Sequence, residues 1–505
     1  MKPSGFVPFV HGDAVPRRKV PILEIAEFRK ALLDAIQGGQ RLVSWSGHEA
    51  GDGSVELLAV LADDVNGTLA AAVTRVRDGY PSVTPECPQA HWFEREIAEQ
   101  WAIKPEGHPW LKPIRFHAPY RAGASMPGGE GSPLPGVTDY FHMEGDEVHE
   151  VAVGPVHAGV IEPGHFRFQC HGETVFHLEI ELGYQHRGLE RHLRGGPDRK
   201  TVHYLETAAG DTTIGHATAY AHLVEQLASV RVPSRAQVLR GVALELERLA
   251  NHTGDLGALA GDVGYLPTAS YCGRIRGDWL NLTAVLCGNR FGRGLVRPGG
   301  LGVTVDAAAI AEVQKRLDAL EKDLTSAVEL LWSTNSVMAR FEETGCVSRQ
   351  DAETIGLVGP AARASGIARD IRNDFPSGIY RYAHIPVGAW HSGDVFARAF
   401  IRWTECQRSI AFIREQLSML GEGAVQVACG LLAPDTLAVS LVEGWRGEIC
   451  HVALTDPAGR FAHYKVVDPS FHNWFGLALS LRNQAISDFP LCNKSFNLSY
   501  CGHDL

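Results

Sequence analysis

Three side chains able to bind a metal or carry protons stand together in the last residues of the chain, NLSYCGHDL. Cys501 offers a thiol, His503 an imidazole and Asp504 a carboxylate, and these groups are common metal ligands and proton carriers. Such a tail supplies at most half of a metal site. The other half would have to come from a segment that is distant in the sequence.

The remaining cysteines argue against a metal site built by this chain alone. The ten cysteines are scattered and no C-x-x-C pair occurs, whereas iron–sulfur clusters and structural zinc usually need closely spaced thiolates. Cys170 and His171 are adjacent in a predicted strand, so their side chains point to opposite faces. A strand cysteine beside a surface histidine is favoured there over zinc ligands. We expect no metal and no cluster bound by this chain.

Length and composition describe a globular protein of more than one domain. The 505 residues suffice for two or three domains, and 45% hydrophobic and 21% charged residues are ordinary values. A formal net charge of −11 argues against a sequence-independent nucleic-acid binder. No apolar run reaches the roughly 18 residues of a membrane helix, and the first residues lack a signal-peptide core. We expect a cytoplasmic chain that meets the membrane only through partners.

Hydrophobic periodicity divides the chain into four parts. Residues 1–20 predict an extended leader, and residues 21–116 a small α+β domain. In that domain we expect helices over 25–39, 67–79 and 92–103, and strands over 41–49 and 55–63. Residues 117–147 are rich in Gly, Pro and Ser and predict a linker.

The fourth part, residues 148–505, begins with predicted short strands up to residue 185 and continues with long helices. We expect helices over 234–261, where Ser234 and Gln237 suggest a capping box, over 305–341 and over 393–420. Strands are expected again between residues 446 and 467. The predicted fold class is α+β, with a small N-terminal α+β domain and then a helical bundle flanked by antiparallel β-structure.

Motifs in both halves resemble known families. WFEREIAEQWAIKPEGHPWLKPI is similar to the signature of the 30-kilodalton subunit of respiratory complex I, a W-x-E-R-E helix followed by G-H-P-x-L. From about residue 150 onward, GPVHAGVIEPGHFRFQCHGETVFHLEIELGYQHRGLERHL, ELERLANHTGDLGAL, RPGGLGV, RGEICH and PSFHNW resemble the large subunit shared by complex I and nickel–iron hydrogenases. The resemblance is strongest to the formate-hydrogenlyase or hydrogenase-4 type, in which the complex I C and D subunits are fused.

The resemblance implies an oxidoreductase subunit that lies peripherally on the inner face of the cell membrane. Its implied partners are a small iron–sulfur subunit carrying a 4Fe-4S cluster and antiporter-like and anchor membrane subunits. In the hydrogenases, one cavity holds nickel and iron on four cysteines, in R-x-C-G-x-C and D-P-C-x-x-C. In complex I, the same cavity binds a quinone.

This chain departs from the family at all four thiolate positions. The first pair falls on Ala209 and Thr212, beside Gly210, and the second pair falls on Ser499 and Gly502. Methyl, hydroxyl and hydrogen side chains cannot replace bridging sulfur, so we expect a degenerate nickel–iron site whose cavity these five residues line. The His and Tyr of the quinone site fall on Ile161 and Gly210, and a first family histidine is kept as His157. A quinone bound in another pose stays open as the cofactor.

Proton-carrying residues survive around the implied cavity. Glu162 matches the glutamate that relays protons in hydrogenases, and His157, His165, His186 and Arg187 lie in the same motifs. We expect these five residues to form the proton relay or the cavity wall. The alternative for Glu162 is a structural ion pair with Arg167 or Arg187.

Two functions follow from the resemblance. The first is an electron-transfer subunit that lacks the nickel–iron centre and passes electrons from a partner iron–sulfur subunit to a quinone or another small acceptor. The alternative is a catalytically silent structural or coupling subunit of such a complex. Hydrogenase activity itself is not expected from this chain.

Overall fold

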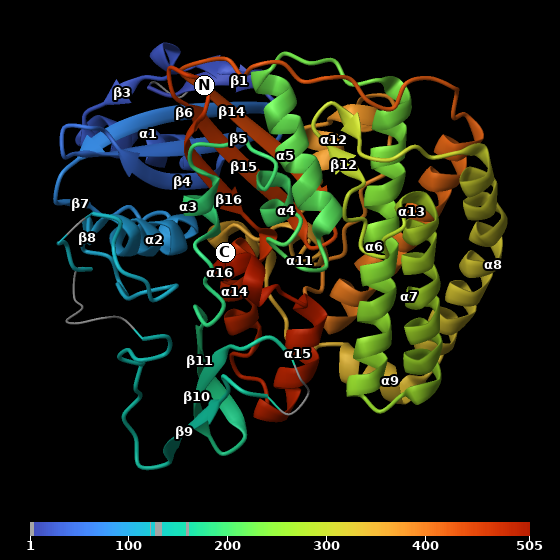
Figure 1. The fold of residues 1–505 in the computed structure, drawn as a ribbon. Helices are drawn as coiled ribbons and strands as arrows, with labels where there is room; N and C mark the ends of the chain where they lie inside the picture. Colours follow the sequence, from blue (N-terminus) through green and yellow to red (C-terminus); the bar gives the residue numbers. More distant parts are fainter. Residues whose placement is uncertain (1–4, 122, 127–133, 158–160) are drawn as a thin grey trace.

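The computed structural model describes residues 5–121, 123–126, 134–157 and 161–505. The predicted leader lies partly outside these ranges at residues 1–4, as does the predicted linker at 122 and 127–133. Figure 1 shows the N-terminal sheet at one side of the molecule and a bundle of long helices at the other, with the C-terminal sheet between them. The mixed helices and antiparallel sheets confirm the predicted α+β class.

The N-terminal sheet has the strand order β1-β6-β5-β4. Its strands are β1 (Val7–Val10), β4 (Arg41–Glu49), β5 (Val55–Asp63) and β6 (Thr68–Val76), and β3 (Ile22–Leu23) runs parallel beside β6. The helices of this part are α1 (Ile25–Gln37) and α2 (His91–Trp101), with the short pair β7 (Gly79–Pro81) and β8 (Lys104–Glu106) between and after them. The predicted strands β4 and β5 and both of these helices are confirmed.

The predicted helix over 67–79 is wrong, because most of this segment forms β6. The strand lies between β1 and β5, and seven of its nine residues are buried. A strand covered on both faces has no alternation of polar and apolar residues, so its run of alanines and valines fits a helical pattern equally well. Antiparallel pairing with β1 and β5 decides the outcome.

The described part of the predicted leader, residues 5–20, is extended over much of its length but contains the 3-10 helix η1 (Arg17–Lys19), and it joins two sheets. Its strand β1 pairs with β6, whereas β2 (Val15–Pro16) pairs with β14 (Thr436–Gly444) near the other end of the chain. The C-terminal sheet has the order β16-β15-β14-β2, with β15 (Gly447–Thr455) and β16 (Phe461–Val467). The first residues of the chain therefore connect the two halves directly.

The second half begins with a three-stranded antiparallel sheet of β9 (Val148–Val153), β10 (His165–His171) and β11 (Thr174–Glu181). The long helices are α5 (Thr213–Leu227), α6 (Ser234–Asp262), α7 (Leu266–Cys287), α8 (Ala307–Trp332) and α13 (Val395–Ser418). Within the described residues, no helix is both long and apolar enough to cross a membrane. Shorter elements are α3 (Leu189–Leu193), α4 (Thr201–Leu205), β12 (Val296–Arg297), β13 (Gly300–Leu301), α9 (Asn335–Phe341), α10 (Arg349–Ile355), α11 (Gly359–Ala364), α12 (Ile371–Asp374), η3 (Gly378–Arg381), α14 (Pro469–Ser480), α15 (Phe489–Phe496) and α16 (Tyr500–Asp504).

Two helix predictions need correction. The helix expected over 305–341 is interrupted after Trp332, so that α8 and α9 are separate. The capping box expected at Ser234 is absent from this described segment, because Pro233 takes the N-cap position without a side-chain bond. Gln237 instead donates its Nε2 hydrogen to the Val232 carbonyl oxygen at 2.9 Å.

A shared hydrophobic core joins the halves. One cluster of buried side chains contains Trp45 and Leu58 of the N-terminal sheet together with Leu441 and Val452 of the C-terminal sheet. The larger cluster lies within the helices and reaches β10 and β11. Because burying apolar area is the main source of stability, the two sheets fold as one packed unit.

Buried charges also cross the junction. The charged side chains of α2 do not face water: Glu96 is fully buried and pairs with Arg115 and with Lys465 of β16. Lys465 also pairs with Glu190 of α3 at 2.9 Å. Arg115 donates its Nε hydrogen to the His503 carbonyl oxygen at 3.0 Å. This network, Glu96–Arg115–Lys465–Glu190, ties α2 to the C-terminus of the chain.

A second buried network crosses the helical bundle. Arg363 pairs with Glu405 of α13 at 2.7 Å and with Glu443 of β14 at 2.9 Å. Glu245 of α6 pairs with Arg372 at 3.0 Å and accepts a hydrogen bond from the Tyr380 hydroxyl at 2.7 Å. All of these groups except Tyr380 are at most 7% exposed, so each charge depends on its partner.

We predict that Arg115→Met destabilises the folded chain by about 3–5 kcal/mol, because Glu96 loses one of its two cations and the His503 carbonyl loses its donor. The thermal unfolding midpoint of the full chain measures this loss. Arg316→Met, which removes an exposed pair within α8, is the matched control and should cost less than about 1 kcal/mol. Equal losses in the two variants would contradict a joining role for Arg115.

Candidate functional site

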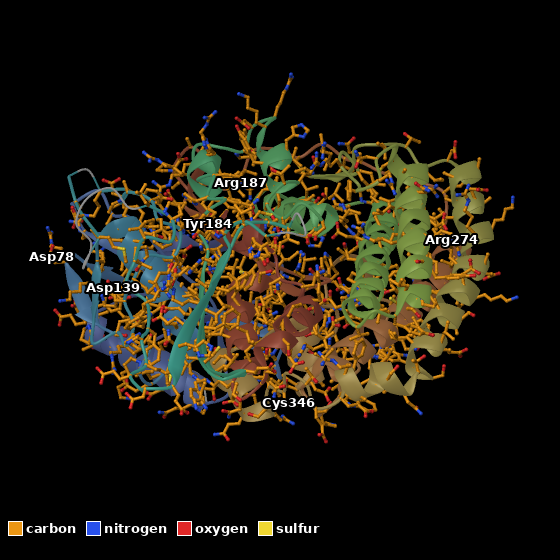
Figure 2. All side chains as sticks on the ribbon, turned by 90° about the horizontal axis from the view of Figure 1, so that it is seen from below. Asp78, Asp139, Tyr184, Arg187, Arg274 and Cys346 are labelled. Carbon is orange, nitrogen blue, oxygen red and sulfur yellow. The ribbon has the colours of Figure 1, made fainter. Side chains whose placement is uncertain are left out.

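Three segments that are far apart in the sequence meet beside the C-terminus. They are the loop 207–212 before α5, the C-terminal helix α16, and the turn that contains Glu162. Arg187 holds two of them together, donating to the carbonyl oxygens of Thr207 at 2.6 Å, Ala208 at 2.9 Å and Cys501 at 3.2 Å. Figure 2 shows Arg187 and Tyr184 on the segment that follows β11. Arg187 therefore acts as a clamp on the backbone in this structure.

The C-terminal tail is buried, contrary to what its position in the sequence suggests. His503 is 1% and Asp504 0% exposed. The Asp504 carboxylate accepts backbone hydrogen bonds from Gly183 at 2.8 Å and Gln185 at 2.9 Å. These contacts fix α16 against the loop that leads to Arg187.

Of the two C-terminal positions of the implied ligand set, position 502 has no room for a side chain, and position 499 carries a hydroxyl that caps its own helix. A Cβ atom on Gly502 would lie 2.7 Å from the Asp468 Cγ, which is closer than real Cβ contacts. Ser499 is turned back into its own helix, where its hydroxyl accepts a hydrogen bond from Gly502 N at 2.9 Å. The Asp468 carboxylate thus fills the space that a side chain at position 502 would need.

The other two positions differ from each other. Thr212 is 1% exposed, and its hydroxyl accepts hydrogen bonds from Trp445 Nε1 at 3.1 Å and Arg446 Nη1 at 3.3 Å. Ala209 is fully buried. The neighbouring Gly210 is exposed, and a Cβ atom placed on it would meet nothing within 4 Å. The open part of the site is therefore at Gly210.

An ion pair closes the loop 207–212 over this region. Arg446 binds both carboxylate oxygens of Asp211, at 2.6 and 2.7 Å, and stacks on the Trp445 ring at 3.9 Å. Arg446 also donates its Nε hydrogen to the Asn497 carbonyl oxygen at 2.5 Å. A two-pronged arginine–carboxylate pair fixes geometry strongly, so the loop is held to the start of β15 and to the segment before α16.

Behind the ion pair lies a chain of buried polar groups. The His216 Nε2 atom lies 3.0 Å from Asp468 Oδ2, and its Nδ1 atom lies 3.1 Å from His451 Nε2. The Tyr464 hydroxyl lies 2.8 Å from His451 Nδ1. All four side chains are at most 1% exposed. The chain holds the Asp468 carboxylate in the place described above.

Glu162 makes neither of the ion pairs considered for it among the described residues. Arg167 pairs with Glu150 at 2.9 Å, and Arg187 binds the backbone carbonyls. The Glu162 Oε1 atom instead accepts a hydrogen bond from Cys501 N at 3.3 Å. Burial and the nearby Glu162 carboxylate raise the pKa of Cys501 to about 11, so Cys501 is a neutral thiol at neutral pH.

The three predicted relay histidines all bind backbone carbonyls. His157 Nε2 lies 2.9 Å from Gly164 O, His165 Nδ1 lies 3.2 Å from Gly154 O, and His186 Nδ1 lies 2.8 Å from Asp504 O. Burial and Arg115 lower the pKa of His186 to about 4. His186 is therefore neutral at physiological pH, and its role as a proton carrier stays a prediction.

Glu247 of α6 reaches the start of α5 beside the same loop. Its carboxylate accepts hydrogen bonds from Ile214 N at 2.7 Å and Gly215 N at 3.1 Å. These backbone N–H groups are free for Glu247 because Thr212, at the N-cap position of α5, makes no side-chain capping bond. Burial, reinforced by the Asp211 carboxylate, raises the pKa of Glu247 to about 8. The side chain lies at a small cavity shared with Asp211 and Asn251. Glu247 is a protonatable group that can take up a proton near neutral pH.

Sequence reasoning missed Asp211, Arg446, Asp468 and Glu247. Arg446 and Glu247 stand inside RGEICH and ELERLANH, two of the quoted motifs, so their positions were visible although their partners were not. Asp468 precedes PSFHNW, and Asp211 lies between the two implied ligand positions 209 and 212. No spacing rule connects residues 211 and 446, because only the fold brings them together.

The donor set does not fit a nickel–iron centre. Soft thiolates hold nickel and iron in such centres, and the four positions offer a methyl, two hydroxyls and a hydrogen. The nearby Cys501 is protonated and lies between the two C-terminal positions. In the described part of the chain, no group of three or more His, Cys, Asp and Glu side chains is arranged to hold a metal ion.

Two family models match the chain. Residues 22–134 match the model described as the 30 Kd subunit of respiratory-chain NADH dehydrogenase. Residues 262–434 match the model described as its 49 Kd subunit. The two models match in the order of the two predicted halves.

Curated relatives extend the match over most of the chain. The carbon monoxide-induced hydrogenase of Rhodospirillum rubrum is 30% identical over 350 residues, which cover 69% of this chain and 97% of the relative. Formate hydrogenlyase subunit 5 of Escherichia coli (strain K12) is 28% identical over 448 residues, covering 86% and 78%. The D subunit of NADH-quinone oxidoreductase from Clostridium beijerinckii is 28% identical over 322 residues, covering 63% and 87%.

We predict that one added methyl group is costly at one position of the site and nearly neutral at another. Gly502→Ala should destabilise the chain by about 1–3 kcal/mol, since its Cβ overlaps the Asp468 carboxylate. Gly210→Ala should change stability by less than about 0.5 kcal/mol, because its Cβ meets nothing. Thermal unfolding of both variants tests this, and a tolerated Gly502→Ala would show that Asp468 does not block the position.

Glu247 should make stability depend on pH. A carboxyl whose pKa is raised from 4.5 to about 8 keeps its proton in the folded chain after the unfolded chain has lost it. Its contribution to stability therefore falls as the pH rises from 4.5 to 8. Relative to the parent chain, Glu247→Gln should gain stability between about pH 5 and about pH 9. Midpoints of thermal unfolding measure this slope, and Glu422→Gln, an exposed control, should not change it.

Proposed function

We propose that this chain transfers electrons in an oxidoreductase complex and does so without a nickel–iron centre. The chain belongs to the family of fused large subunits found in formate-hydrogenlyase-type hydrogenases and in respiratory-chain NADH dehydrogenase, and the complex would be related to these. Relatives in this family are named as subunits of hydrogenases and of quinone oxidoreductases. The proposal for this chain in particular rests on the chemical groups that its own residues supply at the site.

The contact between Gly502 and Asp468 carries the proposal. A side chain at position 502 would overlap a carboxylate that His216 holds in place. The opposite half of the site is closed by the pair Arg446–Asp211, which also engages Thr212. Both halves of the former ligand set are thus occupied by interactions of the chain itself, which supports a function that needs no metal here.

Electrons would come from a 4Fe-4S cluster in a partner iron–sulfur subunit and leave on a quinone or another small acceptor. Gly210 gives the open edge at which such an acceptor could approach. Reducing a quinone to a quinol consumes two electrons and two protons. Glu162 lies beside Cys501 and pairs with no cation among the described residues, so its carboxylate is available to hold and deliver a proton.

The complex would attach this chain to the membrane through antiporter-like and anchor subunits, on the inner face of the cell membrane. The helices described here offer no membrane span. A peripheral position through partners is consistent with that finding and with the names of the relatives.

The second candidate is a silent coupling subunit, which transmits conformational change without chemistry. The observation that favours it is the use of His157, His165 and His186 to bind backbone carbonyls. Such contacts make the region rigid. In this case the emptied site would serve only to hold α16 and the loop 207–212 together.

The test uses the purified complex that contains the full chain. Metal analysis should find iron from the partner but no stoichiometric nickel, and the complex should reduce a quinone or a redox dye. Glu162→Gln should lower turnover by about 100-fold, because the amide cannot carry a proton. Glu150→Gln, which removes the exposed carboxylate paired with Arg167, is the matched control and should leave turnover near the parent value.

Stoichiometric nickel would contradict both candidates. An intact complex that shows no redox turnover, and in which Glu162→Gln changes nothing, would favour the silent coupling subunit over electron transfer. Turnover that falls equally in Glu162→Gln and Glu150→Gln would remove the proton role of Glu162.

A further inference from the structure

A polar pocket of about 530 Å³ lies between the N-terminal segment and the helices, and its lining shares no residue with the site described above. Its wall comes from residues 11–14, the end of α5, the start of α6 and η3. A volume of this size is typical of sites for small molecules, roughly 300–1,000 Å³. No part of the proposed electron-transfer function uses this pocket.

Cationic side chains outnumber acidic ones at this pocket. Arg231, Arg240 and Arg381 line it, together with Asp13 and Glu225. Arg240 and Glu225 neutralise each other in a two-pronged pair at 2.7 and 3.1 Å. This leaves the positive charges of Arg231 and Arg381 against the single negative charge of Asp13. The remaining charge at the mouth is positive, which favours an anion.

The Arg381 guanidinium lies beside the backbone of the N-terminal segment. Its Nη2 atom lies 2.8 Å from the position that a Cβ on Gly12 would take, and Gly12 has a φ of +100° that other residues rarely adopt. The Nε atom donates to the Pro376 carbonyl oxygen at 3.3 Å. In the part of the chain that the structure describes, the Arg381 side chain donates no other hydrogen bond, so both Nη groups remain available to a ligand.

The inner wall carries polar atoms without protein partners. Among the described residues, His222 Nδ1 and Gln226 Oε1 are buried and have no partner in hydrogen-bond geometry. His11 is 4% exposed, and its Nε2 atom accepts a hydrogen bond from Leu441 N at 3.0 Å, so Nδ1 carries the hydrogen in the neutral ring and is directed to the backbone of Phe375. Buried polar groups are nearly always hydrogen-bonded, and here two side chains with an unpartnered atom line one pocket.

A smaller chamber of about 30 Å³ adjoins the pocket and shares His222, Gln237 and Arg240 with it. The chamber is lined by Thr218, whose buried Oγ1 atom also lacks a partner among the described residues, and by Tyr380. It has room for a single small polar group or one water molecule. The pocket therefore narrows from a cationic mouth to a small chamber whose charged side chains, Arg240, Arg372 and Glu443, are paired within the protein.

We propose that this pocket binds a small oxyanion-bearing molecule, whose phosphate or carboxylate group is held by Arg381 at the mouth and whose polar body reaches His11, His222 and Gln226. Burial and the neighbouring arginines lower the pKa of His222 to about 3, so this histidine acts as a neutral hydrogen-bonding group at physiological pH. The ligand would bridge residues 11–14 and the helices α5 and α6.

Isothermal titration of the full chain in its complex tests the proposal, with sodium phosphate in one arm, sodium succinate in the other and sodium chloride at equal ionic strength as the reference. We expect saturable binding of phosphate or succinate, and the anion that binds identifies the group. Arg381→Met should weaken binding about tenfold or more, because a charge-assisted hydrogen bond is lost. Arg274→Met removes an exposed arginine of α7 (Figure 2) and should leave binding unchanged.

Hydrogen exchange provides a second readout on the same samples. The bound anion should slow exchange of the backbone at residues 11–14 and 230–232 in the parent chain and in Arg274→Met, but not in Arg381→Met. Absence of saturable binding by both anions would overturn the proposal. Binding of equal strength in Arg381→Met would overturn the proposal as well, because the anion would then bind somewhere other than at Arg381 and the pocket would contain only water.

Discussion

Charges that leave water must find partners, and this requirement determines how the two halves of the chain fit together. Glu96 of the N-terminal half is fully buried, and its cations come from residues 115 and 465. Arg115 in turn binds the backbone of His503. An unpaired charge at this depth would be very costly. The N-terminal domain, the C-terminal sheet and the last helix are therefore positioned by one set of ion pairs.

The same principle shapes the site beside the C-terminus. The loop 207–212 is fixed by Arg446 and Asp211 on one side and by Arg187 on the other. Asp468 is held by His216 where a side chain at position 502 would stand. The framework around positions 209, 212, 499 and 502 thus keeps its shape through polar contacts within the protein.

Sequence patterns predicted much of the fold where periodicity was strong, including α1, α2, α6, α13 and the strands β4 and β5. They failed at β6, because a strand covered on both faces shows no alternation. The residues that the motifs singled out, 162, 187, 209–212 and 499–502, do meet in the fold, and their role as a functional site stays a prediction. The motifs did not reveal the partners, because Asp211–Arg446 and Asp468–Gly502 join residues that only the tertiary fold brings together.

The close approach of Gly502 to Asp468 has a consequence for attempts to engineer this protein. A cysteine introduced at position 502 would need the carboxylate at 468 to move, and that carboxylate is tied to His216, His451 and Tyr464. Introducing thiols at positions 209, 212, 499 and 502 alone would leave the new thiol at 502 in a space already filled. A set of four thiolates could therefore be built here only by substitutions made together, at residue 468 as well as at the four positions themselves.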